Sequence, residues 1–304
     1  MKKKILITGG TGFLGYNYLQ FLKKKKIYSL YSLSRKIPNS KKKIKNVKYL
    51  VADLSNPKSL LKINKIQFDY VVNFAGNINH KEKTKTMNSH FKGVVNLVRI
   101  LNKKNLIKFV QIGSSVEYGK IKSPHIEPKK IPLQKKIYSV YGYAKLLSTI
   151  FLMKENLKNN FPSIIIRPYL IYGPHQTPNR LIPYTIISCL KKKNFPCSHG
   201  SQTRDFIYIS DAINFIHKVM INKDVGIIIN LGSGKRIKVK TIIKYIVKIC
   251  KGGYPNFGKI KLRNDEQLNL YPSVSFARSK KLKQKIGILE GLKLTISHYK
   301  QNYK

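Results

Sequence analysis

Short apolar runs alternate with longer amphipathic segments over the first 170 residues of the chain. The apolar runs predict buried strands at 5–8, 27–33, 47–51, 70–74, 108–112 and 164–167. Apolar residues at helical spacing predict helices between them, near 13–24, 57–64, 86–103 and 138–158. Strands that alternate with helices pair in parallel through right-handed crossovers, so this pattern predicts an α/β fold with a Rossmann-type doubly wound parallel sheet.

The pattern becomes irregular after residue 167, where four prolines lie between residues 168 and 183. Further apolar runs predict strands at 205–209 and 227–230, and helical spacing predicts helices at 211–221, 239–250 and 289–302. We therefore expect two domains: a Rossmann domain over 1–167, and a smaller mixed lobe over 168–304 that is partly interleaved with it.

Neither a membrane segment nor a metal site is expected. The chain starts with Met-Lys-Lys-Lys before an apolar run, as a secretory signal does, but Gly9 and Gly10 interrupt that run after a few residues. No stretch reaches the roughly 18 apolar residues that a membrane helix needs, so we expect a cytoplasmic protein without a membrane partner. Cys189, Cys197 and Cys250 form no CxxC pair and have no histidine at metal-ligand spacing, which argues against a zinc site or a disulfide scaffold.

The composition is strongly basic, because 60 Lys and Arg against 12 Asp and Glu give a formal net charge of +48. A disordered polycation is excluded, since 42% of the residues are hydrophobic and stand in blocks. Only 8 of the 60 cations are arginine, the residue that specific nucleic-acid sites use for bidentate contacts, and no zinc-finger or RNA-recognition motif is present. We expect contacts with nucleic acid to be non-specific only, through the basic surface at low salt.

The sequence GGTGFLG, which starts at Gly9, follows the first predicted strand and opens the first predicted helix. In this position Gly9 allows a tight turn, Gly12 lets the backbone approach a diphosphate, and Gly15 allows close packing of the helix on the strand. The diphosphate would lie at the helix N-terminus, beside Phe13 and Leu14. This placement predicts a dinucleotide-binding loop rather than a purely structural glycine turn.

The end of the second predicted strand carries Ser34 and Arg35 and no acid. A carboxylate there would bind the ribose hydroxyls of NAD, whereas a hydroxyl and a guanidinium suit the 2′-phosphate of NADP. We therefore expect NADP(H), with NAD(H) as the alternative if Arg35 is only a surface cation. Asp53 and Leu54 follow the third strand and are expected beside the adenine, although a helix N-terminal role competes for Asp53.

Tyr141 and Lys145 stand four residues apart on a predicted helix and therefore share one face. A tyrosine with an ordinary pKa near ~10 acts as an acid or base near neutrality only when its phenolate is stabilised, which a neighbouring lysine and an oxidised nicotinamide both do. Ser114 follows the fifth predicted strand and supplies a hydroxyl that can polarise a carbonyl. The glycine loop, Ser114 and the Tyr141–Lys145 pair, in that order, predict a catalytic set.

With these elements together, the chain resembles the extended short-chain dehydrogenase/reductase family of nucleotide-sugar epimerases, dehydratases and reductases. The resemblance continues in VVNFAG at 71–76, RPYLIYGP at 167–174, RDFIYISD at 204–211, NLGSG at 230–234 and EGL at 290–292. It implies Tyr141 as the acid/base, Ser114 as the carbonyl-orienting hydroxyl, and Lys145 as the partner of Tyr141 that also holds the cofactor ribose. It further implies a cofactor contact at Ala75 and nucleotide-sugar contacts in the second lobe at Asn179, Arg180, Arg204 and Arg263, with the last two on the diphosphate.

One departure from the family decides between its reactions. Family 4,6-dehydratases have an Asp-Glu pair directly after the catalytic hydroxyl residue, where this chain has Ser115 and Val116. Glu117 stands one residue further on, and in a strand-like stretch that step reverses the side-chain direction, so dehydration is not expected. The leading expectation is an NADPH-dependent 4-keto-6-deoxyhexose reductase like those that make CDP-abequose or CDP-paratose. The alternatives are a nucleotide-sugar 4-epimerase, such as UDP-glucose 4-epimerase, with tightly bound NAD, and a non-catalytic RNA-binding member of the fold.

Three further points come from the resemblance. His90 stands where the family commonly has Asn, which leaves open whether it affects the site or only the packing. Family members often dimerise through the helices near 86–103 and 138–158, so a homodimer is expected. The chemistry would belong to lipopolysaccharide or other surface-polysaccharide synthesis.

Overall fold

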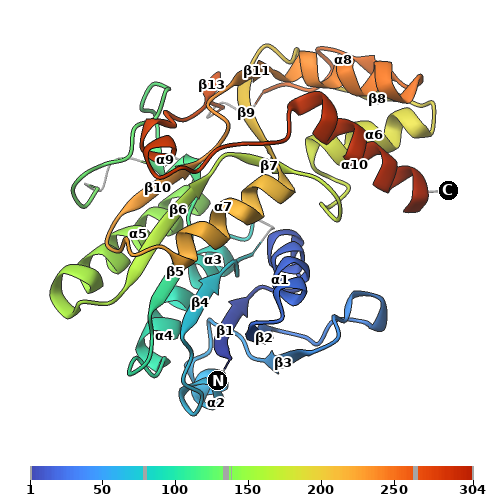
Figure 1. Cartoon of the computed structure of the whole chain (residues 1–304). Coiled ribbons are helices and arrows are strands. Elements are labelled where there is room, and N and C mark those ends of the chain that lie inside the picture. The colour runs from blue at the N-terminus through green and yellow to red at the C-terminus, as the bar shows by residue number, and fades with distance from the viewer. Residues whose placement is uncertain (1, 78–80, 133–136, 138, 263–265, 303–304) are drawn as a thin grey trace. The chain divides into compact units, whose positions relative to one another are not determined.

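The path of the chain divides into two units (Figure 1). The computed structural model describes residues 2–77, 81–132, 137, 139–262 and 266–302. Unit 1 comprises Met1–Gly119, Glu127–Arg167 and Ile216–Ile229, and unit 2 comprises Lys120–Ile126, Pro168–Phe215 and Asn230–Lys304. The chain therefore enters each unit three times.

Unit 1 is built on a seven-stranded parallel sheet with the order β10-β6-β5-β4-β1-β2-β3. The strands are β1 (Lys3–Thr8), β2 (Tyr28–Ser34), β3 (Val47–Val51), β4 (Tyr70–Asn73), β5 (Lys108–Ile112), β6 (Ser163–Pro168) and β10 (Ile228–Leu231). The chain runs outward from β1 to β3, then returns beside β1 with β4 and continues in the other direction. In doubly wound sheets, nucleotides bind at such a switch point, beyond the carboxyl ends of the strands.

Helices connect the strands of unit 1. They are α1 (Phe13–Lys25), α2 (Leu61–Asn64), α3 (Lys83–Met87), α4 (Gly93–Ile100), α5 (Val140–Asn159) and the second half of α7 (Ile209–Ile221), with short 3-10 turns at Ser40–Lys42 and Pro57–Leu60. The helix predicted at 86–103 is interrupted, because a π-helical turn at Asn88–Lys92 joins α3 to α4. The segment at 113–119, expected to be strand-like, instead contains a 3-10 turn at Ser115–Tyr118.

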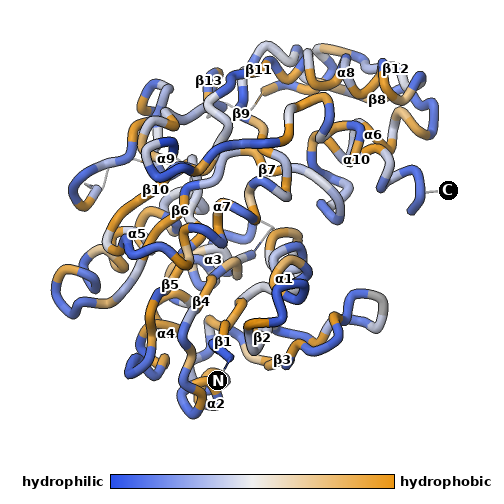
Figure 2. The backbone as a smooth tube through the Cα atoms, viewed as in Figure 1, coloured by the Kyte–Doolittle hydropathy of each residue, from blue (hydrophilic) through white to orange (hydrophobic). Residues whose placement is uncertain are grey.

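The central strands of unit 1 are buried on both faces, which explains their uninterrupted apolar sequences. Leu6, Val71 and Phe109 are partners in register across β1, β4 and β5, and all three are fully buried. They belong to one core cluster with Val94 and Leu97 of α4. Figure 2 shows hydrophobic residues along these strands, whereas hydrophobic and hydrophilic positions alternate along α1. The α/β fold with a doubly wound sheet that the sequence predicts is therefore confirmed.

Unit 2 has a smaller mixed sheet in which β9 (Thr203–Tyr208) pairs in parallel with β7 and β13 and antiparallel with β11. Its other elements are β7 (Leu170–Tyr172), β8 (Asn194–Pro196), β11 (Arg236–Lys238), β12 (Tyr254–Asn256), β13 (Asn269–Leu270), α6 (Leu181–Leu190), α8 (Val239–Cys250), α9 (Ser275–Ser279), α10 (Ile288–Asn302) and the first half of α7. In the part of the chain that the structure describes, no helix has the length and apolar character needed to cross a membrane.

All three cysteines lie in unit 2, although they are far apart in the sequence. Cys189 lies near the end of α6 and Cys250 ends α8, and the two thiols form a hydrogen bond. All three are free thiols. Helix packing thus brings together two cysteines whose sequence spacing gave no sign of contact.

Candidate active site

The glycine loop joins β1 to α1 with the geometry that its sequence predicts. Gly9 has φ +68, and a Cβ atom there would lie 2.9 Å from the backbone nitrogen of Ala75. Gly12 is the N-cap of α1, and no side chain caps the first turn of this helix. A Cβ atom on Gly12 would meet only the carbonyl oxygen of Gly9, at 3.3 Å, so the space in front of the helix N-terminus is a cradle that a side chain would fill. These residues, with Phe13 and Leu14 in the first turn, fit the diphosphate of a dinucleotide.

Ser34 and Arg35 lie beside this loop, because the backbone N–H of Gly9 donates to the carbonyl oxygen of Leu33 at 2.8 Å. Ser34 ends β2, and its hydroxyl donates to the carbonyl oxygen of Lys36 at 3.2 Å. The Arg35 side chain is exposed. The end of β2 thus lies beside the glycine loop, and contacts of Ser34 and Arg35 with a cofactor ribose or 2′-phosphate remain a prediction.

Asp53 organises the turn that follows β3. Its Oδ1 accepts hydrogen bonds from the backbone nitrogen and the hydroxyl of Ser55, at 2.8 and 2.7 Å. The N-cap of the following 3-10 turn is Asn56 and not Asp53. Leu54 is buried in the core of unit 1. The contacts of Asp53 within the protein are therefore local, and a contact with the adenine remains a prediction.

Ser114 and Lys145 lie at the carboxyl end of β5, and Tyr141 precedes Lys145 by one helical turn in α5. Ser114 follows β5 and is the N-cap of the 3-10 turn, where its hydroxyl accepts the N–H of Val116 at 3.4 Å. Tyr141 and Lys145 lie in the first turns of α5, which Ser139 caps through the N–H of Gly142 at 3.0 Å. The Lys145 Nζ donates to the carbonyl oxygen of Ile112 at 2.6 Å, two residues before Ser114. The sequence alone could propose these partners but not this link.

Burial controls the charge of Lys145. The residue is 4% exposed, and burial lowers its pKa to about 8, while the negative charge of Glu117 opposes this effect and raises it. The amine remains mostly protonated at neutral pH. One of its three N–H groups is used by Ile112, which leaves two for a ligand.

His90 lies against Tyr141. Its ring meets that of Tyr141 edge to face, with the centroids 4.9 Å apart. The same ring fills the space beside Gly76, where a Cβ atom would lie 1.9 Å from His90 Cε1. Its Nε2 is 3.0 Å from the carbonyl oxygen of Asn77. His90 thus packs against Tyr141 and against the VVNFAG segment that contains Ala75.

Glu117 was expected to point away because its segment was interpreted as a strand, but the 3-10 turn directs it inward. Its side chain is buried and forms an ion pair with Arg167, with 2.8 Å between Arg167 Nη2 and Glu117 Oε2. Neither Ser115 nor Val116 supplies a carboxylate, so the turn has no acid at the two positions that dehydratases use. The sequence contained one signal for this arrangement, the Ser-x-x-Glu spacing of a capping box from Ser114.

The residues expected to bind substrate lie in unit 2 at different positions. Asn179 and Arg180 are exposed, and Arg180 is the N-cap of α6. Arg204 lies in β9, is 6% exposed, and forms an ion pair with Glu266. Arg263 lies outside the described residues. No group of three metal-ligating side chains is present within the described ranges of the chain.

Asp205, the residue after Arg204 in β9, anchors the glycine-rich turn after β10. Its carboxylate accepts the backbone N–H groups of Ser233 and Gly234 at 2.8 and 2.6 Å. Burial raises its pKa to about 6, against the effect of these hydrogen bonds. Asp205 therefore has a structural role that the motif alone does not indicate.

A doubly wound sheet with a glycine loop after β1 and a serine, tyrosine and lysine at the end of β5 defines a nucleotide-dependent short-chain oxidoreductase. Comparison with known proteins gives the family. The sequence model of the NAD dependent epimerase/dehydratase family matches residues 5–232. The chain belongs to this family, as an extended-type short-chain dehydrogenase/reductase.

Relatives carry several activities. The chain is 26% identical to the dTDP-D-glucose 4,6-dehydratase of Mus musculus, over 99% of this chain and 90% of the relative. It is also 26% identical to the CDP-abequose synthase of Salmonella typhimurium, over 93% of this chain and 92% of the relative. The solved UDP-glucose 4-epimerase of Thermotoga maritima, with UDP-glucose, has a TM-score of 0.89 at 19% identity and covers 99% of this chain and 100% of that structure. The sequence-based assignments to the family and to its enzymes are confirmed.

Proposed function

We propose that this enzyme is an NADPH-dependent reductase that acts on carbon 4 of a nucleoside-diphosphate 4-keto-6-deoxyhexose, similar to CDP-abequose synthase. The observation that carries the proposal is the environment of Glu117. The acid and base that eliminate water must reach the sugar, but Glu117 is buried and bound to Arg167. Since Ser115 and Val116 carry no carboxylate, the turn retains groups for carbonyl chemistry and lacks those for dehydration.

Three residues, Ser114, Tyr141 and Lys145, have different roles in the proposed carbonyl reduction. The Ser114 hydroxyl accepts the N–H of Val116, which leaves its own proton available for a hydrogen bond to the sugar oxygen. Tyr141 gives a proton to the alkoxide that forms at this oxygen. Lys145 holds the ribose of the cofactor with the N–H groups that Ile112 does not use, and its positive charge favours the phenolate of Tyr141. The reduced nicotinamide, when bound, supplies the hydride.

The cofactor and substrate contacts complete the proposal. The glycine loop would hold the dinucleotide, with the N-terminus of α1 binding its diphosphate. Arg35 and Ser34 favour the 2′-phosphate of NADP(H), because the end of β2 has no carboxylate to bind ribose hydroxyls. Arg204 in unit 2 binds the sugar-nucleotide diphosphate in exchange for Glu266, with Asn179 and Arg180 on the substrate side.

The protein surface at α4 and α5 supports a homodimer. A surface cavity of about 530 Å³ lies here, and its lining includes the apolar side chains of Phe91, Val95 and Phe151. These three side chains are half-buried, and their accessible apolar surface is removed from water when a second copy covers it. We propose a two-fold dimer through these helices. Phe151→Glu should convert it to a monomer in light scattering after size exclusion, and an unchanged mass would contradict the interface.

The test of the proposed function has two steps. The purified protein is denatured and the released nicotinamide nucleotide is identified and quantified by mass spectrometry. We expect little nucleotide, or NADP(H), and then oxidation of NADPH at 340 nm with a nucleoside-diphosphate 4-keto-6-deoxyglucose. Near-stoichiometric NAD, with interconversion of UDP-glucose and UDP-galactose, would overturn the proposal in favour of the 4-epimerase.

Tyr141→Phe is the matched variant for this test. The ring and its contact with His90 remain, and only the phenol oxygen is lost. We expect turnover to fall by at least about 1000-fold, within the range for loss of a general acid, while NADPH binding changes little. Retained activity would overturn the role of Tyr141.

A further inference from the structure

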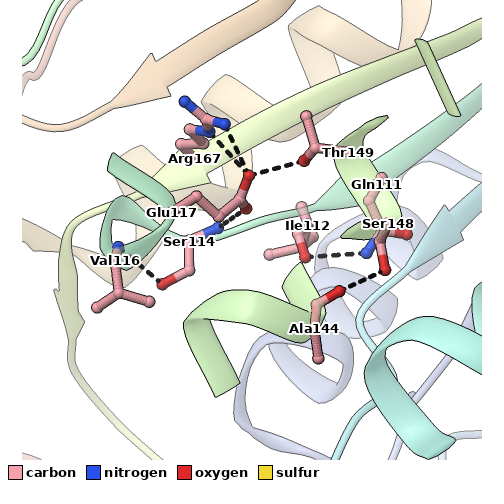
Figure 3. A network of polar contacts seen from close by, with 9 residues as sticks. All are labelled: Gln111, Ile112, Ser114, Val116, Glu117, Ala144, Ser148, Thr149 and Arg167. Carbon is pink, nitrogen blue, oxygen red and sulfur yellow. Dashed lines mark hydrogen bonds and ion pairs between the residues drawn. The ribbon is translucent and has the colours of Figure 1, made fainter. Parts of the chain in front are cut away.

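One buried carboxylate joins the three elements that converge on the active site. The Glu117 Oε1 accepts the backbone N–H of Ser114 at 2.7 Å. Its Oε2 accepts the hydroxyl of Thr149 at 2.7 Å and the Nε of Arg167 at 3.0 Å. Figure 3 shows these contacts converging on Glu117 from the end of β5, from α5 and from β6. Glu117 is 4% exposed and Arg167 is 1% exposed, so the network is isolated from water.

The local sequence explains how this carboxylate reaches its place. Ser114 and Glu117 form a capping box at the 3-10 turn after β5, in which the side chain of each residue accepts a backbone N–H from the other. Arg167, near the end of β6, completes the network, and its guanidinium also lies over the ring of Tyr118, 4.4 Å from the centroid. Thr149 follows Lys145 by one helical turn. The carboxylate therefore contacts the strand end that carries Ser114 and the helix that carries Tyr141 and Lys145.

We propose that Glu117 is a positioning residue of this enzyme: together with Arg167 it fixes the Ser114 turn against α5 and provides the negative charge that faces the Lys145 ammonium. This inference rests on the proposed function, because that function gives Ser114 and Lys145 their roles. It adds that the reactive geometry depends on a carboxylate that touches neither substrate nor cofactor.

Stability alone does not explain a buried ion pair at this position. Taking both charges from water costs several kcal/mol, and replacement of such a pair by apolar residues is often neutral or stabilising. The hydrogen bonds of such a pair are directional, so the pair fixes the relative positions of the groups that it joins even where it adds little stability. The charged group that acts on Lys145 is Glu117 of the 3-10 turn. Arg167 from β6 pairs with Glu117 and lies over the ring of Tyr118. His90 of the π-helical turn packs on Tyr141, one helical turn before Lys145 in α5.

Two buried lysines of unit 1 allow a test that needs no substrate. Burial lowers the pKa of both Lys145 and Lys108 to about 8. Lys108 lies at the other end of β5, where its Nζ donates to Asn222 Oδ1 at 2.7 Å, and the carboxylate that raises its pKa is Asp224. Each lysine thus has its own acid, and each serves as an internal control for the other.

The experiment is an NMR titration of the protein labelled with 13Cε-lysine. Lys145→Met and Lys108→Met assign the two signals that titrate near pH 8. In Glu117→Gln we expect the midpoint of Lys145 to fall by about one pH unit, and that of Lys108 to stay in place. In Asp224→Asn we expect the midpoint of Lys108 to fall and that of Lys145 to stay in place. A folded Glu117→Gln protein in which Lys145 titrates as in the wild type would overturn the inference.

Two further variants keep the test informative if Glu117→Gln does not fold around the unpaired Arg167 guanidinium. Glu117→Gln with Arg167→Met removes both charges, and we expect this protein to fold and to show the lowered Lys145 midpoint. Thr149→Val keeps both charges and removes only the hydrogen bond that joins Glu117 to α5. It should lower kcat about tenfold at unchanged KM while Lys145 titrates normally, since misplacement affects the reaction more than binding. Wild-type titration in the double variant, or wild-type kcat in Thr149→Val, would overturn the inference.

The outcome is separable from that of the proposed function. If the Lys145 midpoint falls as expected and no 4-keto sugar nucleotide is reduced, Glu117 keeps its charge role and the proposed substrate is wrong. If reduction occurs and the Lys145 midpoint does not move in folded Glu117 variants, the proposed function stands and the positioning role of Glu117 is refuted.

Discussion

Gly12→Ala and Gly15→Ala should separate the two tasks of the glycine loop. Gly12 has φ −82 and ψ 172, a conformation that alanine adopts without strain, and its Cβ would meet only Gly9 O at 3.3 Å. Alanine is a poorer N-cap than glycine but restricts the unfolded chain, and these opposing effects leave the unfolding free energy within about 1 kcal/mol of the wild type. The fold should therefore tolerate this methyl group.

Gly15→Ala places its methyl group against backbone that cannot move aside. The Cβ would lie 2.4 Å from Gly9 O and 2.7 Å from Gly10 Cα. Overpacking of this kind lowers the unfolding free energy by about 1–3 kcal/mol, and the higher helix propensity of alanine offsets about 1 kcal/mol of this loss at most. We expect a net loss of about 1–2 kcal/mol in unfolding free energy, together with displacement of the loop.

Binding of the dinucleotide should distinguish the variants from their control. The Gly12 methyl group would occupy the diphosphate cradle and remove charge-assisted hydrogen bonds worth about 3 kcal/mol, which corresponds to roughly 100-fold in Kd. Gly287→Ala is the matched control, because nothing lies within 4 Å of its added Cβ. Urea denaturation of the apo protein and calorimetry with NADPH measure the two effects. Wild-type NADPH affinity in Gly12→Ala would refute the cradle, and wild-type stability in Gly15→Ala would refute the steric argument.

Three further predictions concern single groups. Iodoacetamide should modify Cys250 before Cys189 and Cys197, because the hydrogen bond from Cys189 lowers the pKa of Cys250 whereas burial raises that of Cys197; equal rates in peptide mass spectrometry would contradict this. Burial lowers the pKa of His217 from 6.5 to about 4, so its contribution to stability is complete above pH 6.5 and is lost as the pH falls toward 4. Urea titrations at pH 7 and 4 should show a loss of about 2 kcal/mol that His217→Phe lacks, and an equal loss in the variant would assign the effect elsewhere. Arg35→Ala should raise the Kd for NADPH about tenfold and leave that for NADH unchanged, and an equal effect on both cofactors would exclude a 2′-phosphate contact.

The sequence predicted those parts of the fold and site that depend on short-range patterns. Continuous apolar runs located the strands because both sheet faces are buried, and the glycine spacing located the turn after β1. Spacing of four residues also placed Tyr141 and Lys145 on one helical face. Each of these inferences uses residues within a few positions of one another, where local geometry decides the outcome.

The contacts that sequence reasoning missed depend on the packing of distant segments. Glu117 meets Arg167 fifty residues later, and interpretation of its segment as a strand gave its side chain the wrong direction. The π-helical turn at Asn88–Lys92 breaks a pattern that is regular in the sequence. Cys189 and Cys250 meet because two helices end at one place. Such pairings follow from sheet order and helix packing, which residue spacing does not encode.

β10 is the last strand of the seven-stranded sheet to be synthesised, and this order affects the folding of the nascent chain. In unit 1, Ile165 donates its N–H to Ile227 O at 3.0 Å and Gly226 donates to Ser163 O at 2.7 Å, so the segment beside β6 is made some sixty residues after it. Until that segment leaves the ribosome, β6 is an open edge with three consecutive isoleucines, the kind of edge that pairs with other chains. A fragment that stops at residue 167 would keep this edge permanently. The nascent protein therefore passes through a stage that is prone to aggregation, and a chaperone that shields β6 would benefit it most between the emergence of β6 from the ribosome and that of residues 226–231.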